Sequence, residues 1–154
     1  MKFATFRSDA RPHYGAVTNK GIIALDEIFP QWPTLFDAVK DGGLDVLTEA
    51  ALRGSVTHKK YKYEMVLPDA RRILCVGVNF PNRNAEYMDS SVQSKYMSLF
   101  ARFPSAFTGH ESPLVRPPES HTLDYEGEVA VVIGKSGRRI APENAYDHIS
   151  AITI

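Results

Sequence analysis

Short apolar runs separated by turn residues dominate the first third of the chain. Residues 3–6, 14–18 and 21–25 have the length and composition of short β-strands. Asn19-Lys20-Gly21 lies between the last two runs and predicts a tight turn in which Gly21 adopts a positive φ. Arg11-Pro12 is expected to interrupt the chain ahead of the second strand.

Two short helices are predicted next. Pro33-Thr34 is a start signal for a helix over 34–40, and the glycines at 42 and 43 end it. A second helix is expected over 44–53, with Gly54 as its stop. The polar, basic stretch 55–64 is interpreted as a solvated linker.

The rest of the chain predicts a mainly β unit with few helices. Buried strands are expected at 73–78 and 126–133, because both contain continuous β-branched or apolar runs. Short helices are expected at 83–88 and 142–148. The chain stops inside the extended apolar run 151–154, whereas termini are usually polar, so we expect a fragment of a longer protein.

Composition mainly argues against certain partners and structural features. The 154 residues include 18 Lys plus Arg and 18 Asp plus Glu, and this zero net charge predicts neither a nucleic-acid nor a membrane partner. No apolar run approaches the roughly 18 residues of a membrane span, and the charged start is unlike a signal peptide. The single cysteine, Cys75, cannot form an intramolecular disulfide, which fits a cytoplasmic location.

The chemistry of the chain is expected at Glu126-Gly127-Glu128. On a strand, these two carboxylates point to the same side, roughly 7 Å apart. The apolar run 129–133 predicts that the strand enters the protein interior, where two carboxylates repel each other and lose solvation. A cation would remove both penalties, and oxygen ligands favour Mg²⁺, Mn²⁺ or Ca²⁺ over zinc. An exposed strand face without function has the same spacing, so the pattern alone leaves both interpretations open.

Several segments, among them Ser120 with Leu123 ahead of the two carboxylates, together resemble one known family. Residues 123–134, Leu-Asp-Tyr-Glu-Gly-Glu-Val-Ala-Val-Val-Ile-Gly, are similar to the carboxylate signature of the fumarylacetoacetate hydrolase family. Residues 73–80 resemble the strand that leads into the family's lid, and 103–109 resemble its pocket-wall motif. Residues 2–35 resemble the small N-terminal domain of many bacterial members. The resemblance therefore spans nearly the whole chain.

The resemblance implies a mainly β, α+β fold. A small α/β N-terminal domain is expected over 1–65. The first part of a catalytic domain with a rolled, mixed β-sheet is expected over 66–154, with the C-terminal part absent. Members act on small keto acids and generally form homodimers or higher homo-oligomers, so the same partners are expected here.

The resemblance also implies roles for individual residues. Glu126 and Glu128 would be ligands of Mg²⁺ or Mn²⁺, with a third carboxylate beyond Ile154. Hydrolases of the family carry a His–Glu pair on the lid; here Glu86 matches the glutamate, while Arg83 stands in place of the histidine. Arginine cannot accept a proton at neutral pH. Glu86 acting alone, Arg83 binding a substrate carboxylate, a reaction other than hydrolysis, and a plain surface pair all remain open.

Three further residues are candidates for substrate binding: Arg102, His110 and Tyr125. His13 and His58 are placed in a turn and in the linker, where ordinary surface roles are expected. The leading interpretation is a metal-dependent hydrolase that cleaves a C–C bond in an acylpyruvate or other diketo acid from aromatic breakdown. The alternatives are an isomerase (similar to 5-carboxymethyl-2-hydroxymuconate isomerase), decarboxylase or hydratase of the family, and an inactive fragment serving as a binding or oligomerisation module.

Overall fold

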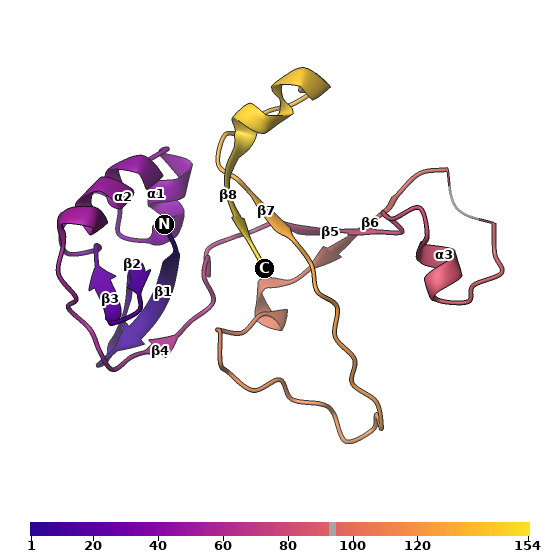
Figure 1. Ribbon diagram of the computed structural model, residues 1–154, viewed down its shortest axis with the longest axis horizontal. Helices are drawn as coiled ribbons and strands as arrows, with labels where there is room; N and C mark the ends of the chain where they lie inside the picture. Colours follow the sequence, from indigo (N-terminus) through magenta and orange to yellow (C-terminus); the bar gives the residue numbers. More distant parts are fainter. Residues whose placement is uncertain (93–94) are drawn as a thin grey trace. The chain divides into compact units, whose positions relative to one another are not determined.

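The computed structural model describes residues 1–92 and 95–154, which divide into two compact units (Figure 1). The first unit consists of Met1–Pro68 together with Thr108–Ile154, and the second of Asp69–Phe107. Helices are few and short, and every strand pair in the described part is antiparallel. This confirms the expected α+β class.

A four-stranded sheet forms the body of the first unit. It contains β1 (Phe3–Ser8), β2 (Arg11–Thr18), β3 (Gly21–Ala24) and β4 (Lys62–Tyr63), in the order β3-β2-β1-β4. The turn between β2 and β3 is the predicted one, and Gly21 has the expected positive φ of 137°. The three predicted strands of this region are therefore confirmed.

The interruption predicted at Arg11-Pro12 is wrong. Both residues lie inside β2, and the turn falls one step earlier, at Asp9, whose φ is 61°. Aspartate enters this left-handed region more readily than most residues. Pro12 is tolerated in the strand because β3 pairs only with Gly15–Thr18, so the missing N–H of Pro12 lies beyond that ladder.

The stretch 55–64 is not a free linker. Its backbone returns to the sheet at His58, where the Ile22 N–H donates to the His58 carbonyl at 2.9 Å. Its last residues form β4 on the other edge, with Tyr63 opposite Phe6. Hydrogen bonds to both edge strands thus outweigh the polar composition of this stretch.

The two predicted helices, α1 (Leu35–Lys40) and α2 (Leu44–Arg53), are confirmed. Thr34 caps α1 with a reciprocal pair of hydrogen bonds. Its hydroxyl accepts from the Asp37 N–H at 3.2 Å, and the Asp37 carboxylate accepts from the Thr34 N–H at 3.1 Å. This capping box satisfies two of the backbone donors at the helix start.

All the fully buried apolar side chains of the described residues lie between Ala4 and Ala51. One cluster joins the helices to β2 and includes Tyr14, Leu25, Leu35 and Leu47. The Tyr14 hydroxyl donates to the Trp32 carbonyl at 3.0 Å. Burial first, and then the charges of nearby aspartates, raises the pKa of Tyr14 to about 12.

The second unit is an antiparallel ladder with a long excursion between its strands. β5 (Ile73–Gly77) pairs with β6 (Ser98–Arg102), and the short helix α3 (Arg83–Glu86) lies between them in sequence. A 3-10 turn, η1 (Pro104–Ala106), follows β6. The predicted strand is confirmed in position, and the predicted helix is shorter than the expected 83–88.

The last part of the first unit contains β7 (Ala130–Ile133) and β8 (Ile149–Thr153), joined through the 3-10 helix η2 (Pro142–His148). The strand predicted over 126–133 therefore begins only at Ala130. The helix predicted at 142–148 is present in 3-10 form. The chain end is extended, as expected, because it pairs with β7.

The expected burial of the 73–78 and 129–133 strands is wrong for this chain. Leu74 is 67% exposed, and Ile133 and Ile152 are 63% and 68% exposed. Among the described residues, each of these strands pairs with one neighbour in a two-stranded ladder, and such a ladder is marginally stable by itself. Within the described residues, no helix has both the length and the apolar character to cross a bilayer.

The cap on α1 gives a stability prediction. Thr34→Ala should lower the free energy of unfolding by about 1 kcal/mol, because the hydroxyl acceptor of the capping box is lost. Thr34→Ser keeps the acceptor and serves as the matched control. Urea unfolding followed by circular dichroism measures both, and equal midpoints for the two variants would contradict the cap's contribution.

Tyr14 gives a pH prediction. Its folded pKa, about 12, lies above the ordinary value of 10.0, so the folded state holds the phenol proton longer than the unfolded chain. The resulting stability is fully present below pH 10.0 and is lost as pH rises toward about 12. Tyr14→Phe should be less stable at neutral pH, by about 1 kcal/mol for the lost hydrogen bond, yet lose less stability across this window. Parallel alkaline loss in both proteins would disprove the assignment.

Candidate functional site

Glu126 and Glu128 lie in an irregular segment just before β7, and both are exposed. The strand geometry that would turn both carboxylates to the same side is absent, because ladder pairing starts at Ala130. Neither carboxylate has a hydrogen bond or ion pair within residues 1–92 and 95–154. The expectation of two desolvated carboxylates at the mouth of a buried strand is therefore wrong for this chain.

The surroundings of the two glutamates nevertheless leave room for a ligand. A Cβ added to Gly127, between them, would meet no atom within 4 Å. Exposed carboxylates without an ionic partner are free to bind a hard cation, and their oxygens match the preference of Mg²⁺ or Mn²⁺. The electrostatic reason for a cation is then the pair of negative charges separated by one residue in sequence, and burial contributes nothing.

Arg83 opens α3 and is held by an ion pair. Its guanidinium donates to Asp89 at 2.7 Å and lies over the Tyr87 ring, 4.8 Å from the centroid. The hydrogen bonds from Ser91 are the largest cause that lowers the pKa of Asp89, and Arg83 adds to them. Arg83 therefore forms its ion pair with Asp89, and the surface pair considered between Arg83 and Glu86 does not form.

Glu86 ends α3 with an exposed side chain. No hydrogen bond or ion pair engages its carboxylate in the described part of the chain, so the group is available to exchange a proton or bind a cation. Arg83 and Glu86 share one short helix, and Arg102 ends β6 in the same unit, where its guanidinium lies 5.1 Å from the centroid of the Phe100 ring.

His110 and Tyr125 belong to the first unit with the two signature glutamates. The His110 ring packs edge-on against Tyr63 of β4, with centroids 5.1 Å apart. A Cβ on Gly109 would lie 2.3 Å from the Tyr63 carbonyl oxygen, so glycine is required for this close approach. Tyr125 is exposed at 87%, which leaves its ring free for a ligand.

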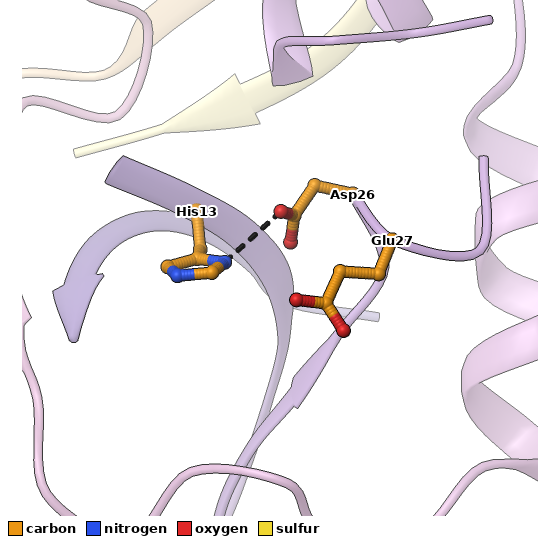
Figure 2. A group of neighbouring side chains, drawn as sticks. All are labelled: His13, Asp26 and Glu27. Atoms are coloured by element: carbon orange, nitrogen blue, oxygen red, sulfur yellow. Dashed lines mark hydrogen bonds and ion pairs between the residues drawn. The ribbon is translucent and has the colours of Figure 1, made fainter. Parts of the chain in front are cut away.

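A polar cluster that the sequence reasoning missed lies in the first unit (Figure 2). His13, Asp26 and Glu27 bring ligand-type atoms within 4.8 Å of one another. His13 is buried in β2 and does not lie in a surface turn, and His58 packs beside it with ring centroids 5.3 Å apart. The residues next to His13 in sequence give no signal of this cluster, because the antiparallel pairing of β2 with β3 brings His13 to the Asp26-Glu27 pair that follows β3.

The comparison with known families identifies the chain. Residues 72–154 match the family described as Fumarylacetoacetate (FAA) hydrolase C-terminal. This match covers more than half of the 154 residues. The chain belongs to the fumarylacetoacetate hydrolase family.

The curated relatives include several tautomerases. Oxaloacetate tautomerase YisK of Bacillus subtilis is 41% identical over 87 residues, which are 55% of this chain and 29% of that protein. The mitochondrial oxaloacetate tautomerase FAHD2A of Bos taurus is 30% identical over 163 residues, covering 100% of this chain and 51% of that protein. The chain thus spans about half the length of the relatives that it matches throughout.

Solved structures agree with the fold. A fumarylacetoacetate hydrolase from Exiguobacterium antarcticum superposes with a TM-score of 0.74 at 27% identity, over 99% of this chain and 53% of that one. A maleylpyruvate hydrolase from Sphingobium, solved with manganese and pyruvate, gives a TM-score of 0.72 at 20% identity, over 99% and 56%. These comparisons confirm the family and the fold class.

The Arg83–Asp89 pair predicts a titration result. Because the Ser91 hydrogen bonds are the largest cause, Arg83→Met should raise the pKa of Asp89 but leave it below its ordinary value of 3.8. Because the folded state lowers this pKa, the ionised Asp89 carboxylate stabilises the turn at pH values above 3.8. This contribution is lost as pH falls through the pKa of the folded state. Carbon NMR of the Asp89 carboxyl measures the shift, and Arg102→Met is the charge-matched control. An unchanged pKa in Arg83→Met would disprove the pair.

Proposed function

We propose that this chain is part of a divalent-metal-dependent enzyme that interconverts keto and enol forms of a small 2-oxo acid. Family membership and the tautomerase names of the curated relatives support this reaction class. The observation that carries the choice is Arg83, which stands where a hydrolase of the family is expected to carry a base. Tautomerisation moves only a proton, so it requires no activated water.

Glu126 and Glu128 are the proposed metal ligands. Their carboxylates are exposed and free of other partners in the described residues, and the open space beside Gly127 admits an ion. Two carboxylates occupy only part of the octahedral shell of Mg²⁺ or Mn²⁺, which leaves positions for substrate oxygens and water. When bound, the cation would stabilise negative charge on the 2-oxo oxygen of the substrate.

The chain's own residues then have distinct roles. Glu86, whose carboxylate is exposed, takes the proton from the carbon next to the keto group and delivers it to the 2-oxo oxygen, which gives the enol; the reverse transfer restores the keto form. Arg83 donates a fork of N–H groups to the distal carboxylate of a dicarboxylic 2-oxo acid. Arg102, His110 and Tyr125 remain predicted substrate contacts.

A C–C hydrolase acting on an acylpyruvate is the second candidate. The solved structure at 27% identity is named a fumarylacetoacetate hydrolase, which supports it. In this case Glu86 alone would have to activate the water, since arginine cannot accept its proton. The expected homodimer and cytoplasmic location stay predictions, and an inactive binding module stays the alternative for the isolated chain.

The proposed metal centre predicts a binding result. Titration calorimetry of the 154-residue chain with Mn²⁺ should show one site that is lost in Glu126→Gln plus Glu128→Gln, because both carboxylates share the ion. Glu119→Gln plus Glu143→Gln removes the same charge from two exposed positions and is the matched control. Equal Mn²⁺ binding by the two double variants would contradict the assignment.

The reaction is tested with oxaloacetate and with an acylpyruvate in parallel. Ultraviolet absorbance follows loss of the enol or of the diketone, using the chain alone and a chimera in which the remainder of the B. subtilis relative follows Ile154. We expect enol–keto conversion that falls at least about a hundredfold in Glu126→Gln plus Glu128→Gln, and little acylpyruvate cleavage. Acylpyruvate cleavage faster than enol conversion would favour the hydrolase, and no turnover of either substrate by either protein would favour the binding module.

A further inference from the structure

The polar cluster of the N-terminal sheet has the composition of a metal site. His13 lies on β2, and Asp26 and Glu27 follow β3, which pairs antiparallel with β2. One ring nitrogen and two carboxylates thus come within 4.8 Å of one another (Figure 2). The side chains of His13 and Asp26 are only 5% and 7% exposed, so both positions are fixed by the surrounding core.

The Asp26 carboxylate is only half satisfied. Its Oδ2 accepts from His13 Nδ1 at 2.9 Å and from Arg11 at 3.2 Å. Its Oδ1 is fully buried and, among residues 1–92 and 95–154, has no hydrogen-bond partner. A buried carboxylate oxygen without a donor costs free energy. In Figure 2 this oxygen lies on the side of Asp26 that faces the Glu27 carboxylate.

The single positive charge of Arg11 neutralises the two negative charges of Asp26 and Glu27 only in part. Its guanidinium also donates to Glu27 at 2.6 Å, so one positive charge serves two negative ones. The Arg11 side chain is 58% exposed, which means that it approaches from solvent and can leave without disturbing the core. A cavity of about 340 Å³, lined by Arg11, His13 and Glu27 together with Asp9 and His58, opens the cluster to solvent.

We propose that His13, Asp26 and Glu27 bind a divalent transition-metal ion, Zn²⁺ or one of similar preference, in competition with the Arg11 guanidinium. Imidazole nitrogen and carboxylate oxygen are both zinc ligands, and three protein ligands leave a fourth position open. The nitrogen ligand favours such an ion over Mg²⁺ or Ca²⁺. This preference separates the site from the oxygen-only pair Glu126 and Glu128.

Metal binding requires one rearrangement of protons and contacts. Coordination through His13 Nδ1 requires that Nδ1 carry no proton and that the ring proton lie on Nε2. The Nδ1 hydrogen bond to Asp26 is replaced by bonds from both groups to the ion, and Arg11 moves to solvent. The ion would tie the start of β2 to the end of β3, so its first effect is on the stability of the N-terminal sheet.

The test uses the 154-residue chain carrying Glu126→Gln and Glu128→Gln. These substitutions remove the proposed ligands of the catalytic metal, so that site does not contribute to the signal. Calorimetry with Zn²⁺ should show one site. Arg11→Met should tighten binding about tenfold, because two competing ion pairs are removed. Glu27→Gln should weaken binding at least about tenfold, because a ligand is lost. Both side chains are exposed by more than half, so the variants should keep the fold.

Controls separate this site from nonspecific binding. Arg53→Met and Glu49→Gln remove charges from an exposed ion pair of α2 and should leave the affinity unchanged. Co²⁺ should give an absorption spectrum with nitrogen ligation, and Zn²⁺ should raise the melting temperature. Unaltered affinity in Arg11→Met or Glu27→Gln, or a spectrum from oxygen ligands alone, overturns the proposal. A cavity that holds only water would show no heat and no melting shift, which overturns it as well. None of these readouts depends on the Glu126–Glu128 site, so they remain informative if that site fails.

Discussion

Burial of apolar surface divides this chain into a stable part and a part that depends on further contacts. Every fully buried apolar side chain of the described residues belongs to the sheet and helices between Ala4 and Ala51. In the described part of the chain, the ladders β5–β6 and β7–β8 carry similarly apolar strands, but many of their apolar side chains stay exposed. The N-terminal sheet is therefore held by a packed core, whereas the described segments that match the family keep much of their apolar surface exposed.

The same division explains how much the sequence predicted. The early strands, the turn at Gly21 and the helix started by Thr34 follow from local turn and capping signals, and they were confirmed. The burial of the segments around Leu74 and Ile133 was predicted from their apolar runs, and this prediction was wrong. An apolar run shows that a strand is able to bury its side chains. It does not show that another layer is present to cover them. The segment 55–64 was misjudged because edge-strand pairing depends on distant backbone groups.

The candidate residues show a similar limit. The pattern at Glu126 and Glu128 identified the family through its neighbours, while the strand geometry assumed for the pair is absent. His13 could not be found from its own surroundings in sequence, since its partner Asp26 is brought to it by strand pairing. Contacts across a sheet determine which polar residues meet, and a single sequence contains no direct record of them.

The close approach of Gly109 to β4 has a topological consequence. The chain leaves the first unit soon after Tyr63 and returns beside the same residue, so 69–107 forms an excursion whose two ends start from neighbouring points. A segment attached in this way can vary in length or sequence without changing the path of the sheet, because the entropy of closing a longer loop grows only slowly. The residues around Arg83 and Glu86 can therefore change in sequence or number while the sheet between Phe3 and Tyr63 keeps its structure.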